Sequence, residues 1–162
     1  MLKLLALGAA LALTTTSALA CETVESKVIP LTFCIDTTMW IASEAVAPQE
    51  FLYFDQPQNL GFIAITELGD ANQADFRTAI LNNAGGGAAT LYGERMETVA
   101  GVDWHVIEYG TVVDGLNLVY QNFYFVNPGV GGVQLVFFST DPDVTKTAVR
   151  AGMVLSTVQF TQ

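Results

Sequence analysis

The side chains that most often carry out chemistry are few in this sequence. Its single histidine, His105, lies near the carboxylates Asp103 and Glu108, which a histidine-dependent enzyme would have to bring into one cleft with it. A histidine-based metal site would also need ligands from carboxylates or cysteines. The cysteines are better explained by a disulfide, so we expect no metal and interpret His105 as a hydrogen-bonded histidine on a sheet surface.

The glycine-rich segments do not match a nucleotide site either. Residues 85–87 are three glycines that follow a helical pattern, and no Gly-Lys-Ser/Thr comes after them, which excludes a P-loop. Residues 129–132 join two strand-like runs. The sequence has no Asp-x-Asp-x-Asp-Gly calcium loop and no Gly-x-Ser-x-Gly nucleophile elbow. We therefore expect no cofactor, no metal and no catalytic residue, and interpret the protein as a non-enzyme.

The N-terminal residues have the pattern of an export signal. One basic residue precedes an apolar run over residues 4–13 that is too short to span a membrane, and small side chains at Ala18 and Ala20 suit a signal peptidase. The pattern predicts a signal peptide over residues 1–20 and a single mature domain over residues 21–162. It also predicts a periplasmic or secreted protein without a transmembrane segment.

Cleavage after Ala20 makes Cys21 the first mature residue, and two interpretations of this cysteine stay open. In an oxidising compartment, Cys21 and Cys34 would form a disulfide that pins the new N-terminus to the first strand. Alternatively, Cys21 is lipidated and anchors the protein to a membrane. A typical lipoprotein has leucine where this sequence has Ala18, and lipidation would leave Cys34 as an odd thiol, so we favour the disulfide.

The charge balance narrows the class of partner. The chain has 16 acidic and 6 basic residues, a formal net charge of −10 at pH 7. Such a surface repels phosphate backbones, so we exclude nucleic acid as a partner. The acidic residues are scattered, which favours a solvated surface over a dedicated acidic docking patch.

Alternating apolar residues and turn signals predict a largely antiparallel sheet. Residues 28–35 contain Pro30, which cannot donate to a neighbouring strand, so we expect an edge strand there. A β-hairpin is predicted over residues 50–55 and 61–68. Four further strands joined by short turns form a meander over residues 90–99, 102–113, 116–126 and 132–139.

Two segments have helical spacing. Residues 72–84 predict an amphipathic helix with Asp70 or Asn72 as its N-cap, and Asp141 suits the N-cap of a second helix. The apolar stripe of the second helix consists of Val144, Ala148, Ala151, Leu155 and Val158, with Lys146 and Arg150 among the positions facing away. Because the last strands are apolar on both faces, we expect an α/β (α+β) fold in which an antiparallel sheet of about six strands is flanked by helices on both faces.

The order of these elements resembles the PsbP/DcrB-like superfamily over nearly all of residues 28–160. The motifs that carry the resemblance are Asp36-Thr-Thr-Met-Trp40, Gly101-Val-Asp-Trp104 and Leu155-Ser-Thr-Val-Gln-Phe160. The resemblance implies a three-layer sandwich and a protein that binds other proteins rather than catalyses. The atypical lipidation site differs from the lipoprotein members of that superfamily.

These observations lead us to expect another envelope protein as the partner. Trp40, Phe51 and Tyr53 are the candidate partner surface, although aromatic side chains of this kind are more often core. Two alternatives stay open. One is a small-ligand or lipid-binding protein with an apolar pocket between sheet and helix, and the other is an uncharacterised hydrolase built around His105.

Overall fold

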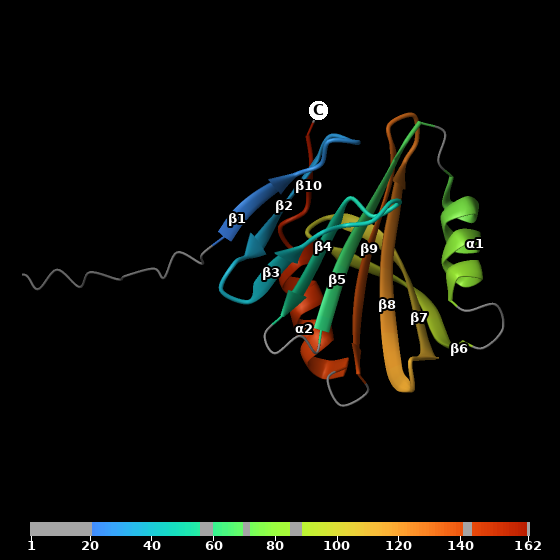
Figure 1. The fold of residues 1–162 in the computed structure, drawn as a ribbon. Helices are drawn as coiled ribbons and strands as arrows, with labels where there is room; N and C mark the ends of the chain where they lie inside the picture. The colour runs from blue at the N-terminus through green and yellow to red at the C-terminus, as the bar shows by residue number, and fades with distance from the viewer. Residues whose placement is uncertain (1–20, 56–59, 70–71, 85–88, 141–143, 162) are drawn as a thin grey trace, which may run out of the picture.

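The computed structural model describes residues 21–55, 60–69, 72–84, 89–140 and 144–161, and Figure 1 shows their arrangement. The fold is mostly β-sheet. Its elements are β1 (Cys21–Glu25), β2 (Leu31–Asp36), β3 (Trp40–Ser43), β4 (Phe51–Asp55), β5 (Leu60–Leu68), α1 (Gln73–Asn83), β6 (Thr90–Val99), β7 (Val102–Val113), β8 (Leu116–Asn127), β9 (Gly131–Thr140), α2 (Val144–Leu155) and β10 (Gln159–Phe160). The predicted leader and its cleavage site lie outside the described residues.

Seven strands form the larger sheet, in the order β3-β4-β5-β9-β8-β7-β6, and all neighbouring strands are antiparallel. The predicted β4–β5 hairpin and the meander from β6 to β9 are confirmed. Two of the meander turns have positive φ at both central residues: Ala100 and Gly101 have φ of 52° and 81°, and Asp114 and Gly115 have φ of 50° and 81°. This conformation matches the twist of the flanking strands, which explains why such short turns suffice.

A second sheet of three strands has the order β1-β2-β10. The prediction of an edge strand over residues 28–35 is therefore wrong, because β2 is the middle strand of this sheet. Pro30 does not interrupt the pairing, since it lies just before β2 and contributes only its carbonyl, which accepts a hydrogen bond from the Thr161 N–H at 2.9 Å. The buried side chains of β2 alternate strictly along the strand and face the larger sheet.

The first helix, α1, begins where the sequence predicts. Asn72 is its N-cap, and the Asn72 side chain accepts a hydrogen bond from the backbone N–H of Asp75. Phe76 and Ile80 are its buried residues, and they pack with tyrosines of β7 and β8. Gly132 of β9 makes room for this contact, because a Cβ atom there would lie 2.4 Å from the Phe76 ring.

The apolar face of α2 differs from the predicted stripe. Ala151 and Leu155 are buried as expected, but Ala148 is exposed, and the remaining buried positions of the helix are Thr147 and Val154. The buried face is therefore rotated relative to the stripe drawn from the sequence. Ala151, Val154, Leu155 and Val158 pack in the core between the two sheets. The predicted N-cap Asp141 lies outside the described residues.

The two faces of the larger sheet are covered differently, which corrects the expectation of helices flanking both faces of a six-stranded sheet. One face is covered jointly by α2 and the three-stranded sheet, and the main core lies between these layers (Figure 1). On the other face, α1 packs against the part formed by β7, β8 and β9, and its Arg77 forms an ion pair with Glu94 of β6 at 2.7 Å. The chain is thus an α/β-type fold of two antiparallel sheets and two helices within its described part.

Candidate functional site

The structure joins Cys21 to Cys34 in a disulfide that links β1 to β2, with the two Cα atoms 5.5 Å apart. Cys34 lies opposite Thr23 in the strand pairing, so the bond runs diagonally across the pair. The backbone N–H of Cys34 also donates to the Thr157 hydroxyl at 2.9 Å. The disulfide and the segment after α2 therefore hold β2 from opposite sides.

The three aromatic residues of the candidate partner surface do not share one environment. Trp40 is 3% exposed, and its ring lies in the main core against Phe62 and Phe137. Phe51 and Tyr53 are half-buried on β4 and pack against the same core. The Trp40 ring is thus not available at the surface, while contact of a partner with Phe51 and Tyr53 stays a prediction.

His105, Asp103 and Glu108 do not converge in one cleft. The His105 ring stacks on Tyr124 with a centroid separation of 5.1 Å, and its Nδ1 lies 2.8 Å from the Gln73 amide nitrogen. Asp103 accepts a hydrogen bond from the Thr98 hydroxyl at 2.6 Å. Glu108 is an odd number of residues from both along β7, so its side chain projects from the opposite face of the sheet.

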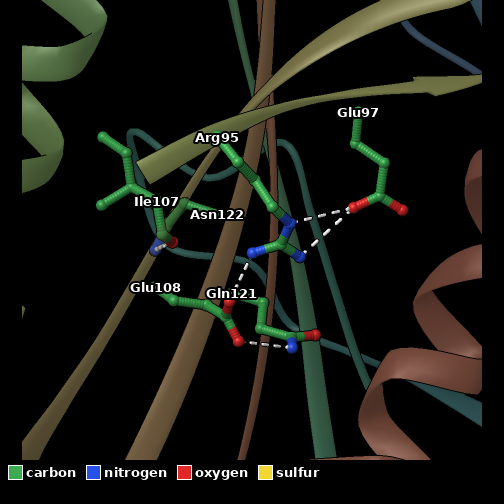
Figure 2. Close-up of polar contacts among 6 residues, drawn as sticks. All are labelled: Arg95, Glu97, Ile107, Glu108, Gln121 and Asn122. Atoms are coloured by element: carbon green, nitrogen blue, oxygen red, sulfur yellow. Dashed lines mark hydrogen bonds and ion pairs between the residues drawn. The ribbon is translucent and has the colours of Figure 1, made fainter. Parts of the chain in front are cut away.

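Glu108 instead belongs to a group of polar side chains on β6, β7 and β8, which Figure 2 shows in close-up. We call this group the Arg95 cluster; its members are Arg95, Glu97, Glu108 and Gln121. The Arg95 guanidinium lies 3.2 Å from a carboxylate oxygen of Glu97 and also donates to Glu108. The Gln121 amide donates to the second Glu108 oxygen at 2.9 Å. A guanidinium shared by two carboxylates is an ion-paired arrangement that suits a binding or structural role.

A second charged group was missed by the sequence analysis. Asp55, at the end of β4, has a side chain with no solvent exposure, and its Oδ2 accepts hydrogen bonds from Lys146 at 2.9 Å and Arg150 at 2.6 Å. Its Oδ1 accepts from the backbone N–H of Leu60. We call Asp55, Lys146 and Arg150 the Asp55 cluster. The prediction that Lys146 and Arg150 face away from the fold is therefore wrong.

Two opposing effects set the pKa of Asp55. Burial of the carboxyl acts to raise this pKa, but the hydrogen bonds from Lys146 and the Leu60 N–H and the charges of Lys146 and Arg150 outweigh burial. The pKa of Asp55 consequently lies below its usual value. Arg150 also lies over the Trp40 ring, 5.7 Å from its centroid, so the cluster fastens α2 to both β4 and the core.

Four apolar side chains of the described residues are exposed at the end of the sheet where β7 turns into β8. We call this end of the sheet the hairpin patch; its side chains are 42–64% exposed, with Tyr92 and Val112 on one face and Val113 and Leu116 on the other. Val113 pairs with Leu116 across the hairpin, and the Tyr92 hydroxyl packs over Gly110. Apolar side chains gathered in this way on an acidic protein are typical of a protein-binding surface.

Two pockets beside the disulfide are candidates for a small ligand. The first has a volume of about 120 Å³ and is lined by Cys21, Cys34, Met39, Trp40, Met153 and Val154 among others. The second has a volume of about 350 Å³ and is lined by Thr23, Thr32, Phe33 and Gln159 among others. Pockets that bury drug-sized ligands have volumes of roughly 300–1,000 Å³. The first pocket is too small for such a ligand or for a lipid chain with its headgroup, whereas the second lies at the lower end of this range.

Within the described residues, no group of three or more histidine, cysteine or carboxylate side chains is placed to hold a metal ion. In the same part of the chain, no helix has the length and apolar character needed to cross a membrane.

The sequence matches no protein-family model and no curated protein. Solved structures are similar at the level of the fold. A protein from Bacteroides thetaiotaomicron is 15% identical with a TM-score of 0.56, over 82% of this chain but only 46% of its own length, so this chain spans about half of that protein.

Two other structures are similar along most of both chains. CyanoP, the cyanobacterial PsbP of Synechocystis, is 13% identical with a TM-score of 0.61 over 93% of this chain and 98% of its own. LpqN of Mycobacterium tuberculosis, a protein involved in cell envelope biogenesis, is 12% identical with a TM-score of 0.61 over 88% of this chain and 91% of its own. The resemblance stated from the sequence motifs is thus confirmed for the fold: this chain has a PsbP-like fold.

Proposed function

We propose that the protein is an exported, non-catalytic module that binds another protein of the cell envelope. The observation that carries the proposal is the hairpin patch, because four apolar side chains are exposed at one end of the sheet of an acidic protein, two on each face. The Cys21–Cys34 disulfide supports an oxidising compartment. The similarity in fold to LpqN, which is involved in cell envelope biogenesis, supports the proposed role in the envelope.

The chemistry of the patch describes the partner. The apolar side chains of the patch favour an apolar contact surface on the partner. The formal net charge of −10 of this protein favours basic side chains around that surface of the partner. The pocket of about 120 Å³ beside the disulfide is too small for a drug-sized ligand, and the neighbouring pocket of about 350 Å³ only reaches the lower end of that size range, so the small-ligand or lipid alternative has less support. Protein binding is therefore the function that the geometry supports best.

Capture from envelope extract tests the proposal when the bait is varied. We expect an envelope protein to be retained by the wild type and lost when Val112→Asp or Leu116→Asp places a charge in the hairpin patch. Val46→Asp is the matched control, because Val46 is 68% exposed and belongs to the segment between β3 and β4. Each variant should keep its stability within about 0.5 kcal/mol, since all three positions are exposed. Equal retention by all baits would contradict the proposal.

The non-catalytic part of the proposal has its own test. The His105 ring stacks on Tyr124 and contacts the Gln73 amide, and neither Asp103 nor Glu108 of β7 is hydrogen-bonded to it. We expect no turnover of ester, amide or phosphate model substrates by the wild type. Hydrolysis that disappears in His105→Ala, with an unchanged melting temperature, would make the protein an enzyme and overturn this part.

A further inference from the structure

Strand β6 is a long, exposed edge of the larger sheet. It has ten residues, and among the described strands only β7 pairs with it, so its outer backbone groups face away from the sheet. Seven of the ten residues are exposed and the other three are half-buried. The opposite edge, β3, has only four residues. An edge of this length is a template for a further strand.

A β-bulge limits the part of β6 that can accept another strand. The pairing with β7 shifts between Leu91 and Gly93 and is then regular from Gly93 to Val99. A bulge twists a strand out of its ladder, so an added strand can follow the edge only over these seven residues. The middle of this regular segment is Met96, which is 52% exposed.

Symmetry restricts how two β6 strands of identical chains can pair. Opposite residues in an antiparallel pair alternate between hydrogen-bonded and non-hydrogen-bonded pairs. A two-fold axis turns each pair into one of the same kind, so it must pass through a residue that lies opposite itself. Centring the axis far from Met96 shortens the ladder or brings the bulge into it. The central position therefore gives the longest regular pairing.

Charge selects the same position. Centring the axis on Glu94, Arg95 or Glu97 would place two like charges directly opposite each other, which is unfavourable. Centring it on Met96 places Arg95 of each copy opposite Glu97 of the other. The residues at the ends of that ladder, Gly93 and Val99, are uncharged.

We propose that a second copy of this chain pairs with β6, antiparallel and about a two-fold axis through Met96, which joins two seven-stranded sheets into one. The Arg95 cluster supplies the specificity. In the single chain, the Arg95 guanidinium reaches Glu97 two residues along its own strand at 3.2 Å. Directly opposite residues of an antiparallel pair have Cβ atoms about 5 Å apart, so Glu97 of the second copy comes within reach of the same guanidinium.

Charge exchange tests the register. We expect the wild type to dimerise in analytical ultracentrifugation, and Arg95→Glu or Glu97→Arg to raise the dimer dissociation constant roughly tenfold or more, because each makes two opposite-charge pairs into like-charge pairs. The double variant R95E/E97R should restore dimerisation, since its pairs are again opposite. Lys27→Glu is the matched control, because it changes the net charge as Arg95→Glu does but lies between β1 and β2.

Cross-linking tests the position of the axis. Residues that lie opposite themselves have Cα atoms about 5 Å apart, which permits a disulfide. Met96→Cys should therefore form a covalent dimer under mild oxidation. Thr98→Cys should not, because positions two residues from the axis lie roughly 13 Å from their symmetry mates. Cys21 and Cys34 are joined, so the introduced thiol is the free one in each variant.

Three outcomes would overturn the proposal. The first is a wild type that stays monomeric at every concentration measured. The second is a dimer that is indifferent to Arg95→Glu and to Glu97→Arg, which would place the contact elsewhere. The third is equal cross-linking of Met96→Cys and Thr98→Cys, which would show an edge-to-edge contact in a different register.

Discussion

The Asp55 cluster and the Arg95 cluster use the same kinds of side chain in opposite settings. In the first, one carboxylate with no solvent exposure is shared by two cations, of which Arg150 is 15% exposed. In the second, one guanidinium that is 43% exposed is shared by two carboxylates. Burial makes the Asp55 cluster a stable attachment of α2 to β4, because removing one member of the ion pair leaves a buried charge without compensation. Exposure leaves the second free to exchange partners, as the proposed dimer requires.

The largest effect is expected from Asp55→Ala. This change leaves Arg150 near the core without its carboxylate, and breaking a buried pair in this way costs about 3–5 kcal/mol of the free energy of unfolding. Urea denaturation followed by circular dichroism measures it. Asp103→Ala, which removes an exposed carboxylate from β7, is the control and should cost less than about 1 kcal/mol. Similar costs for the two variants would remove the contrast between buried and exposed charge.

The two cations of the Asp55 cluster should differ from each other. Arg150 is 15% exposed and also contacts Trp40, so Arg150→Ala should cost about 2 kcal/mol of unfolding free energy. Lys146 is 40% exposed, and solvent screens its attraction to Asp55, so Lys146→Ala should cost less than about 1 kcal/mol. The same denaturation measurement compares them. A larger loss of unfolding free energy for Lys146→Ala than for Arg150→Ala would show that solvent exposure does not determine which of these two ion pairs contributes more.

Acid should weaken the fold through Asp55. Its pKa is lowered in the folded state, so it contributes stability that is present above its unfolded pKa of about 3.9 and is lost as the pH falls through the lower folded pKa. The unfolding free energy of the wild type should therefore fall more steeply below about pH 4 than that of Asp55→Asn, which has no carboxyl to protonate there. Parallel pH profiles for the two proteins would contradict the buried, paired carboxylate.

The smallest effect on the single chain is expected from Arg95→Ala. Exposed ion pairs contribute about 0–1 kcal/mol, so its unfolding free energy should fall by less than about 1 kcal/mol when measured well below the dimer dissociation constant. Raising the salt concentration should reduce even this difference, because the side chains are exposed. A cost near that of Asp55→Ala would make both clusters structural.

The sequence predicted the strands of the meander and the start of α1 because local signals determine them. The residues Ala100-Gly101 and Asp114-Gly115 adopt positive φ that tight hairpins need, and Asn72 caps α1 with its own side chain. β1 was missed for a related reason. Its five residues are mostly exposed and polar, so no apolar alternation marks them as a strand.

The candidate sites were harder to predict because they depend on contacts between distant residues. Lys146 and Arg150 are four residues apart on α2, and nothing nearby in the sequence shows that Asp55 lies beneath them. The sequence shows only that Asp55 is an acidic residue at the end of an aromatic strand, and this pattern does not identify Lys146 and Arg150 as its partners. Likewise, the position of Glu108 beside Arg95 follows from the pairing of β6 with β7, and Trp40 could be placed in the core only once both sheets were known.

The place of β2 in the smaller sheet has a consequence for the order in which the chain folds. One neighbour, β1, directly precedes it, but the other, β10, consists of Gln159–Phe160 near the opposite end of the chain. A strand pair that spans nearly the whole sequence closes a very long loop, and such contacts form late. When the chain is synthesised from its N-terminus, the edge of β2 opposite β1 therefore stays unpaired until the last residues are available. The smaller sheet is begun by the first described residues and finished by nearly the last.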